Sequence, residues 1–226
     1  MTSGDERVPV GTRSHHDYWD SFYAGRESGA VPGEPSAFAR WVAERLRPGQ
    51  PVVELGFGTA RDSMWFAAQG HPVSGYDFAE SAVQRAQGRA DGREVAASFS
   101  VLDLYDDDAV DVVAKDVGST TDRPAVYGRF LIHSLEAPGR TNLFRLAARV
   151  LGEGGELYLE FRTGQDRDAP HLFGEDHYRV YLDPDVVAEE IRAGGGTITE
   201  SLAGHGFAVY QSEDPHVARL VATFTG

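Results

Sequence analysis

The fold of this chain is decided by the stretch Val52-Val53-Glu54-Leu55-Gly56-Phe57-Gly58-Thr59-Ala60-Arg61-Asp62-Ser63. An apolar pair at its start predicts a buried strand over 51–56, and the apolar residues that follow it predict a helix over 59–69. Gly56 and Gly58 form a Gly-x-Gly turn between the two. Glycine lets the backbone approach a ligand without a Cβ atom in the way, and the first N–H groups of a helix have no partner inside the helix. The stretch therefore predicts a strand–turn–helix unit that holds a ligand.

The residues around the turn narrow the kind of ligand. Glycine-rich turns between a strand and a helix also occur in dinucleotide-binding folds, where a third glycine supports the pyrophosphate. Here that position is Arg61, and an acid, Glu54, stands two residues before the first glycine. A dinucleotide oxidoreductase is therefore disfavoured.

Two further acids follow predicted strands. Asp77 ends the strand predicted over 72–76, about twenty residues beyond the glycine turn, which is where an acid meets ribose hydroxyls in a βαβ nucleoside site. Asp103 ends the strand predicted over 97–102. The alternative is that Glu54, Asp77 and Asp103 only cap helices. Three acids in this order favour the nucleoside site.

This order of motifs resembles the class I S-adenosylmethionine (SAM) methyltransferases over roughly Phe38 to Phe161. The size and the short helical N-terminal extension are similar to the thiopurine- and tellurite-type small-molecule branch. Ala60 stands where the family usually has a third glycine, and no Asn-Pro-Pro-Tyr-like tetrapeptide, the mark of many DNA-base and protein-glutamine methyltransferases, follows the fourth strand. The resemblance implies SAM as cofactor, with Asp103 holding the adenine amino group. The residues expected at the cofactor are Glu54, Gly56, Phe57, Gly58, Asp62, Asp77, Phe78, Asp103, Leu104 and Arg129.

The alternation of strand and helix patterns predicts an α/β fold. We expect a Rossmann-like, seven-stranded, mostly parallel sheet with helices on both faces and an antiparallel last strand. Residues 1–34 are expected to form a tail and a lid helix, and 35–226 the methyltransferase domain. Aromatics over 16–24 either cover the cofactor or pack the first helix on the sheet. The other expected strands are 125–131, 155–161, 197–202 and 217–224, and the other expected helices are 35–46, 79–88, 106–113, 140–151 and 183–193.

Composition limits the class of partner. The 226 residues carry a formal net charge of −14, which disfavours a nucleic-acid partner because such binding rests on basic patches. No apolar run approaches the length of a membrane span, and the first residues do not resemble a signal peptide. With no cysteine, thiolate metal sites and thiol nucleophiles are excluded. We expect a cytoplasmic monomer or homodimer that acts on a small molecule without a metal.

Polar residues follow the fourth and fifth predicted strands, where the methyl acceptor is expected. Arg129 and Arg162 are candidates to hold an anionic group, because guanidinium groups bind oxyanions through paired hydrogen bonds. His133 and His177 are candidate general bases, and Glu160 completes the candidate catalytic set. Alternatively, Arg129 pairs with Glu160 as a structural bridge, and the histidines are ordinary polar loop residues.

The sequence thus predicts SAM-dependent methyl transfer to oxygen or nitrogen of a small, anionic metabolite. The alternative is a non-catalytic SAM-binding module that regulates or scaffolds a partner. Release of S-adenosylhomocysteine (SAH) in the presence of an acceptor distinguishes the two.

Overall fold

A computed structural model describes residues 34–118, 123–152, 154–166 and 180–224. The predicted tail and lid helix, except Glu34, lie outside the described residues, as does His177. The statements below concern the described residues.

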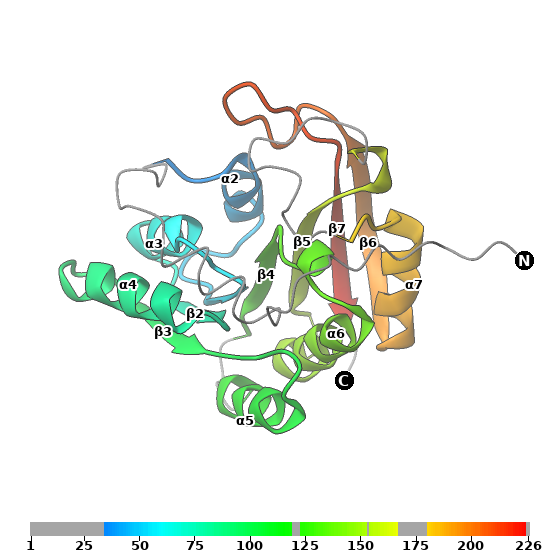
Figure 1. The fold of residues 1–226 in the computed structure, drawn as a ribbon. Coiled ribbons are helices and arrows are strands. Elements are labelled where there is room, and N and C mark those ends of the chain that lie inside the picture. The colour runs from blue at the N-terminus through cyan, green and yellow to red at the C-terminus, as the bar shows by residue number, and fades with distance from the viewer. Residues whose placement is uncertain (1–33, 119–122, 153, 167–179, 225–226) are drawn as a thin grey trace, which may run out of the picture.

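Seven strands form one sheet in the order β3-β2-β1-β4-β5-β7-β6 (Figure 1). Strands β1 to β5 run parallel to one another, whereas β7 runs antiparallel to both β5 and β6. The predicted fold class is therefore confirmed, including the antiparallel last strand. The strands are β1 (Val52–Leu55), β2 (Val73–Asp77), β3 (Ala97–Val101), β4 (Ala125–Arg129), β5 (Glu156–Arg162), β6 (Gly196–Gly204) and β7 (Val217–Phe224).

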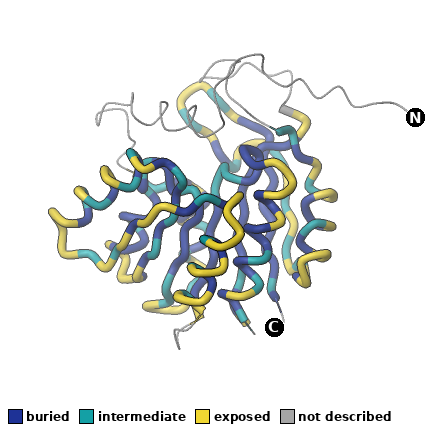
Figure 2. Tube along the Cα trace, turned by 60° about the horizontal axis from the view of Figure 1, so that its bottom comes forward, coloured by how far each residue is buried: buried dark blue, intermediate teal, exposed yellow. Residues whose placement is uncertain are grey.

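Helices cover both faces of the sheet. Helices α2, α3 and α4 pack their buried residues on one face, and α5, α6 and α7 pack theirs on the other. The strands are buried between these two layers, while the outer sides of the helices are exposed (Figure 2). The helices are α2 (Ala37–Ala43), α3 (Arg61–Ala68), α4 (Glu80–Asp91), α5 (Asp107–Gly118), α6 (Ala137–Leu151) and α7 (Pro184–Ala193), with short 3₁₀ turns η2 (Ile132–Ser134) and η3 (Gly164–Asp166).

The fourth strand ends earlier than its sequence predicts. The apolar pattern predicts a strand over 125–131, but β4 ends at Arg129 because Phe130 takes a backbone φ of 55°. This left-handed conformation turns the chain away from the sheet and into η2. The predicted boundary was wrong, and the turn places Arg129 at the carboxyl edge of the sheet, where ligands bind in open α/β folds.

Three helices are longer than predicted, and one of them is α4, which continues to Asp91 rather than 88. Helix α5 continues to Gly118 rather than 113, and α6 begins at Ala137 rather than 140. Pro138 lies in the first turn of α6, where the missing N–H of proline costs no hydrogen bond. Helices α5 and α6 lie side by side, because Val110 and Ala114 belong to the core cluster that α6 also contributes to.

Candidate cofactor and acceptor site

The glycine turn, residues 56–60, links β1 to α3 through three left-handed residues. The φ angles are 66° at Gly56, 53° at Gly58 and 54° at Ala60. A Cβ atom at Gly56 would lie 2.7 Å from Leu131 Cδ1, so this position also needs glycine for packing. Ala60, where the family usually has glycine, holds a conformation that costs an L-residue about 1–2 kcal/mol. The turn is therefore held in shape against a local backbone preference.

Asp77 closes this turn from the end of β2. Its Oδ2 atom accepts the N–H of Gly58 at 2.8 Å, and its Oδ1 atom accepts the N–H of Ala79 at 3.0 Å. Burial raises the pKa of Asp77 to about 6, although these backbone N–H groups and that of Phe78 oppose the rise. A carboxylate offers about four acceptor positions, so lone pairs remain for the hydroxyls of a ribose. The remaining hydrogen-bond acceptor positions of Asp77 suit the ribose hydroxyls of SAM, and its contact with the glycine turn places them where the cofactor is expected.

Residues expected at the adenine lie beside Asp77. The N–H of Leu102 donates to the carbonyl of Asp77 at 2.9 Å, which brings the ends of β2 and β3 together. Asp103 follows, partly buried, with its Oδ1 accepting the N–H of Tyr105 at 2.8 Å. Leu104 is buried and Phe78 is partly buried. The capping alternative fits Asp103 poorly, since it is Asp106 that accepts the N–H of Ala109 at the start of α5.

Glu54 is buried at the carboxyl end of β1. Its carboxylate accepts a hydrogen bond from the Ser63 hydroxyl in the first turn of α3. Burial, together with the nearby charge of Asp62, raises the pKa of Glu54 well above its usual value. Glu54 thus ties the strand to the helix on either side of the glycine turn.

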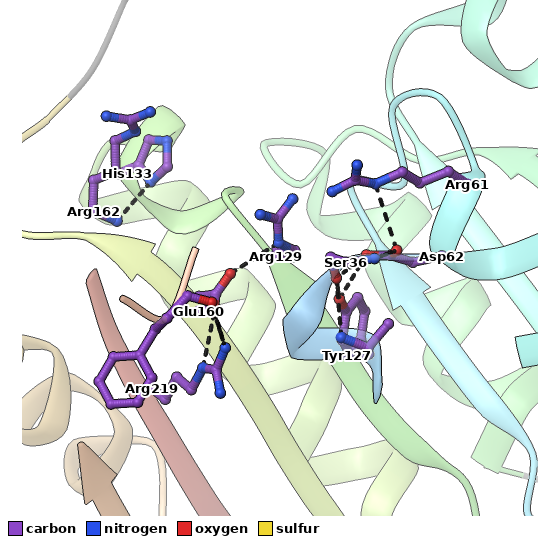
Figure 3. A network of polar contacts seen from close by, with 11 residues as sticks. Ser36, Arg61, Asp62, Tyr127, Arg129, His133, Glu160, Arg162 and Arg219 are labelled. Carbon is purple, nitrogen blue, oxygen red and sulfur yellow. Dashed lines mark hydrogen bonds and ion pairs between the residues drawn. The ribbon is translucent and has the colours of Figure 1, made fainter. Parts of the chain in front are cut away.

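Asp62 belongs to a network that the sequence did not reveal (Figure 3). Its carboxylate accepts the Ser36 N–H at 2.7 Å, the Ser36 hydroxyl at 2.7 Å and the Tyr127 hydroxyl at 2.8 Å. Ser36 is also the N-cap of α2, with its Oγ accepting the N–H of Ala39. Because these contacts occupy both carboxylate oxygens, the network favours a role for Asp62 in fixing α2 and β4 against α3 rather than direct contact with the cofactor.

Three charged side chains cross the sheet at its acceptor end, and we call Arg129, Glu160 and Arg219 the charge row. They lie directly opposite one another on β4, β5 and β7. The Nε atom of Arg129 donates to Glu160 Oε1 at 2.9 Å, and the Nε atom of Arg219 donates to Glu160 Oε2 at 2.8 Å (Figure 3). The structural bridge between Arg129 and Glu160 is therefore present. Arg219 was not identified from the sequence.

Arg162, the second predicted anchor, has a carboxylate partner of its own. Its terminal nitrogen lies 2.7 Å from Glu213 Oε1, and Arg162 is buried while Glu213 is partly buried. The guanidinium groups of Arg129 and Arg162 lie over the ring of Phe130, at 4.2 Å and 5.5 Å from its centroid. The structure thus brings the two predicted arginines to one aromatic side chain. The charge of Arg162 is already balanced by Glu213.

His133 lies buried in η2 beside the end of β5. Its Nδ1 atom accepts the backbone N–H of Arg162 at 3.4 Å. An amide N–H can only donate, so this contact leaves the proton of the neutral ring on Nε2. That tautomer suits a hydrogen-bond donor better than a general base. His177, the other candidate base, is outside the described residues.

Neither a membrane-spanning helix nor a metal cluster is found in the described ranges. In the described ranges, no helix is both long enough and apolar enough to cross a membrane. Within the same ranges, no group of three or more histidine, aspartate or glutamate side chains is arranged to hold a metal ion.

Comparisons with known proteins agree with this geometry. Residues 52–155 match a family described as a methyltransferase domain. The chain is 28% identical to a thiopurine S-methyltransferase of Azotobacter vinelandii, over 77% of this chain and 89% of the relative. A TehB-like SAM-dependent methyltransferase from Corynebacterium glutamicum shares the fold, with a TM-score of 0.61, 17% identity and coverage of 92% of this chain and 94% of the other. A structure solved for the conversion of a disulfide bond into a thioacetal group during echinomycin biosynthesis has a TM-score of 0.70 at 21% identity, covering 93% of each chain.

The fold, the glycine turn with Asp77, and these matches define a class I SAM-dependent methyltransferase. The chain resembles that family most directly over residues 52–155, and it uses SAM as its cofactor. The non-catalytic alternative is thereby set aside.

Proposed function

We propose that this enzyme methylates oxygen or nitrogen of a small acceptor that carries an anionic group, and that Arg129 binds that group. One observation carries the proposal. Arg129 gives only Nε to Glu160, and its terminal nitrogens make no other hydrogen bond among the described residues. Its side chain is 17% exposed, whereas Glu160 beside it is fully buried. Guanidinium nitrogens in this state suit a carboxylate or phosphate.

Electrostatics support the same proposal. Burial alone would lower the pKa of Arg129, but the carboxylate of Glu160 and the nearby Tyr127 and Asp62 raise it, so the guanidinium stays charged. Two arginines and one glutamate give the charge row a net charge of +1. An enzyme with a formal net charge of −14 thus keeps a charged guanidinium, that of Arg129, where the acceptor is expected. The overall charge also supports a small-molecule acceptor rather than a nucleic acid.

In this proposal the protein promotes methyl transfer mainly by positioning the cofactor and the acceptor. Bound SAM supplies a methyl group on a positively charged sulfonium. Asp77 and the glycine turn would hold the cofactor, Phe130 and Arg129 would orient the acceptor, and the buried end of the sheet would limit water. Bringing two reactants into contact in the correct orientation accounts for large rate enhancements without a proton-transfer group. This fits a neutral amine better than an unionised hydroxyl, since the Nδ1 atom of His133 already accepts the N–H of Arg162.

Sulfur is a second candidate acceptor atom. The observation that favours it is the 28% identity to a thiopurine S-methyltransferase. A thiol is partly ionised near neutral pH, because its usual pKa is about 8.5, and it needs little help from a base.

The test is a screen for SAH release with three acceptor classes: aryl amines, phenols and aryl thiols, each with and without a carboxylate. The proposal predicts turnover with the carboxylate-bearing members and identifies the acceptor atom by class. Turnover confined to the uncharged members would reject the anionic acceptor. Absence of turnover throughout, with SAH binding intact, would reject this set of acceptors.

A further inference from the structure

Arg219 is a buried cation for which the proposed reaction has no direct use. Only 4% of its side chain is exposed, and the side chain of its partner Glu160 is fully buried. Its terminal nitrogen also donates to the carbonyl of Phe207 at 3.0 Å. Three aromatic rings surround the guanidinium, those of Phe38, Trp41 and Phe207, at 4.8–5.2 Å. Arg219 is therefore enclosed by protein and does not face an acceptor.

The contacts of Glu160 divide unequally between its two arginines. Oε2 accepts a hydrogen bond from the Nε of Arg219 at 2.8 Å, and a terminal nitrogen of Arg219 lies 2.8 Å from the same oxygen as an ion pair. Oε1 receives only the Nε of Arg129, at 2.9 Å. An arginine and a carboxylate left to themselves commonly form two parallel hydrogen bonds. Here the second oxygen is taken, so Arg129 makes one bond instead of two.

We propose that Arg219 is a positioning residue for the acceptor site: by occupying one oxygen of Glu160, it keeps the terminal nitrogens of Arg129 turned toward an anionic acceptor. The consequence for binding rests on the proposed function, since it is there that Arg129 holds the acceptor. The arrangement also sets the charge. Without Arg219, Arg129 and Glu160 would form a neutral pair, whereas the complete charge row has a net charge of +1.

The decisive variant is Arg219→Met, which keeps the aliphatic length and removes the charge. The proposal predicts that Arg129 then forms a two-bond pair with Glu160, which a crystal structure of the variant shows without any ligand. Benzoate serves as an anionic probe and SAH as the cofactor probe. Benzoate affinity should fall about tenfold or more, the usual cost of a lost charged hydrogen bond, while SAH affinity stays within about threefold of wild type.

Three further variants separate positioning from a general structural role. Arg219→Lys keeps a cation at Oε2 and should bind benzoate nearly as wild type does. The double variant Glu160→Gln/Arg219→Met restores a net charge of +1 with no buried carboxylate, so it should regain benzoate affinity. Arg45→Met is the matched control: its guanidinium lies 3.6 Å from the centroid of the same Trp41 ring, but its ion pair is with Glu200. It should change neither affinity.

The outcomes distinguish this inference from the proposed function. A folded Arg219→Met variant with wild-type benzoate affinity and an unchanged single bond from Arg129 would overturn the inference. If Arg219→Met does not fold, the lysine and double variants decide: weak benzoate binding in both, with SAH binding intact, contradicts the inference. If the wild-type enzyme binds SAH but no benzoate, the anionic acceptor is rejected, and the geometry of Arg129 in the Arg219→Met crystal still decides the role of Arg219.

Discussion

Asp77 is the residue on which cofactor binding depends most directly. We expect Asp77→Ala to weaken SAH binding by about 1–3 kcal/mol, because charged hydrogen bonds to the ribose are lost. Isothermal titration calorimetry measures the change, and Asp108→Ala, an exposed acid in the first turn of α5, is the control. Unchanged SAH affinity in Asp77→Ala would remove Asp77 from the cofactor site.

The same residue predicts a pH dependence of stability. Burial raises the pKa of Asp77 from 3.8 to about 6 in the folded protein, so the folded state binds more protons than the unfolded chain between these values. The contribution of Asp77 to stability is therefore fully present below about pH 4 and is lost as the pH rises to about 6.

Asp77→Asn cannot titrate and isolates this effect. The free energy of unfolding of Asp77→Asn, relative to wild type, should rise by about 2–3 kcal/mol between pH 4 and pH 7. Urea unfolding at a series of pH values measures it. A difference that stays constant over this range would show that Asp77 has an ordinary pKa in the folded protein.

Single residues also show the limit of prediction from sequence. Glu54 could be predicted because it lies in a recognisable strand two residues before the glycine turn, and Asp77 and Asp103 because each ends one of the next two predicted strands. Arg219 could not, because its contact with Glu160 depends on which strand lies beside β5. Its residue type and sequence neighbours carry no sign of that pairing.

At the scale of elements, α2, α3 and β4 are joined by Ser36, Asp62 and Tyr127. Asp62→Ala removes the acceptor of three buried donors, the Ser36 N–H, the Ser36 hydroxyl and the Tyr127 hydroxyl, and should cost about 2–4 kcal/mol of stability. Tyr127→Phe removes a single hydroxyl and should cost about 1 kcal/mol. Urea unfolding compares the two, and equal losses would mean that Asp62 does not organise the network.

Most elements follow from their sequence patterns, and the differences have local causes. The stretch over 125–131 reads Ala-Val-Tyr-Gly-Arg-Phe-Leu, and the apolar pair at its end gives no sign of the left-handed turn at Phe130 that ends β4. Helix α5 extends to Gly118 because its later turns pack against α6, a contact that the predicted weak helix over 106–113 could not include. Tertiary packing, rather than local preference, set these boundaries.

The whole molecule carries a strongly negative charge, and this has a consequence for its partners. Binding to DNA or RNA requires enough basic side chains to neutralise several phosphates. We expect no binding of a 20-nucleotide RNA by fluorescence anisotropy at 50 mM salt and micromolar protein. Binding that weakens steeply as salt is added would reveal a basic surface and contradict the small-molecule assignment.

We propose that the enzyme joins a SAM site at β1–β3 to an anion-binding acceptor site at β4 and β5. The most direct measurement is the rate of SAH release with two matched acceptors, 2-mercaptobenzoate and thiophenol or their amine or phenol counterparts, by wild type and Arg129→Met. The account predicts a KM at least about tenfold lower for the carboxylate-bearing acceptor in wild type, with kcat changed less, and loss of that preference in Arg129→Met. If wild type and Arg129→Met prefer the carboxylate-bearing acceptor equally, or if the uncharged acceptor has the lower KM, an anion-binding role for Arg129 is contradicted.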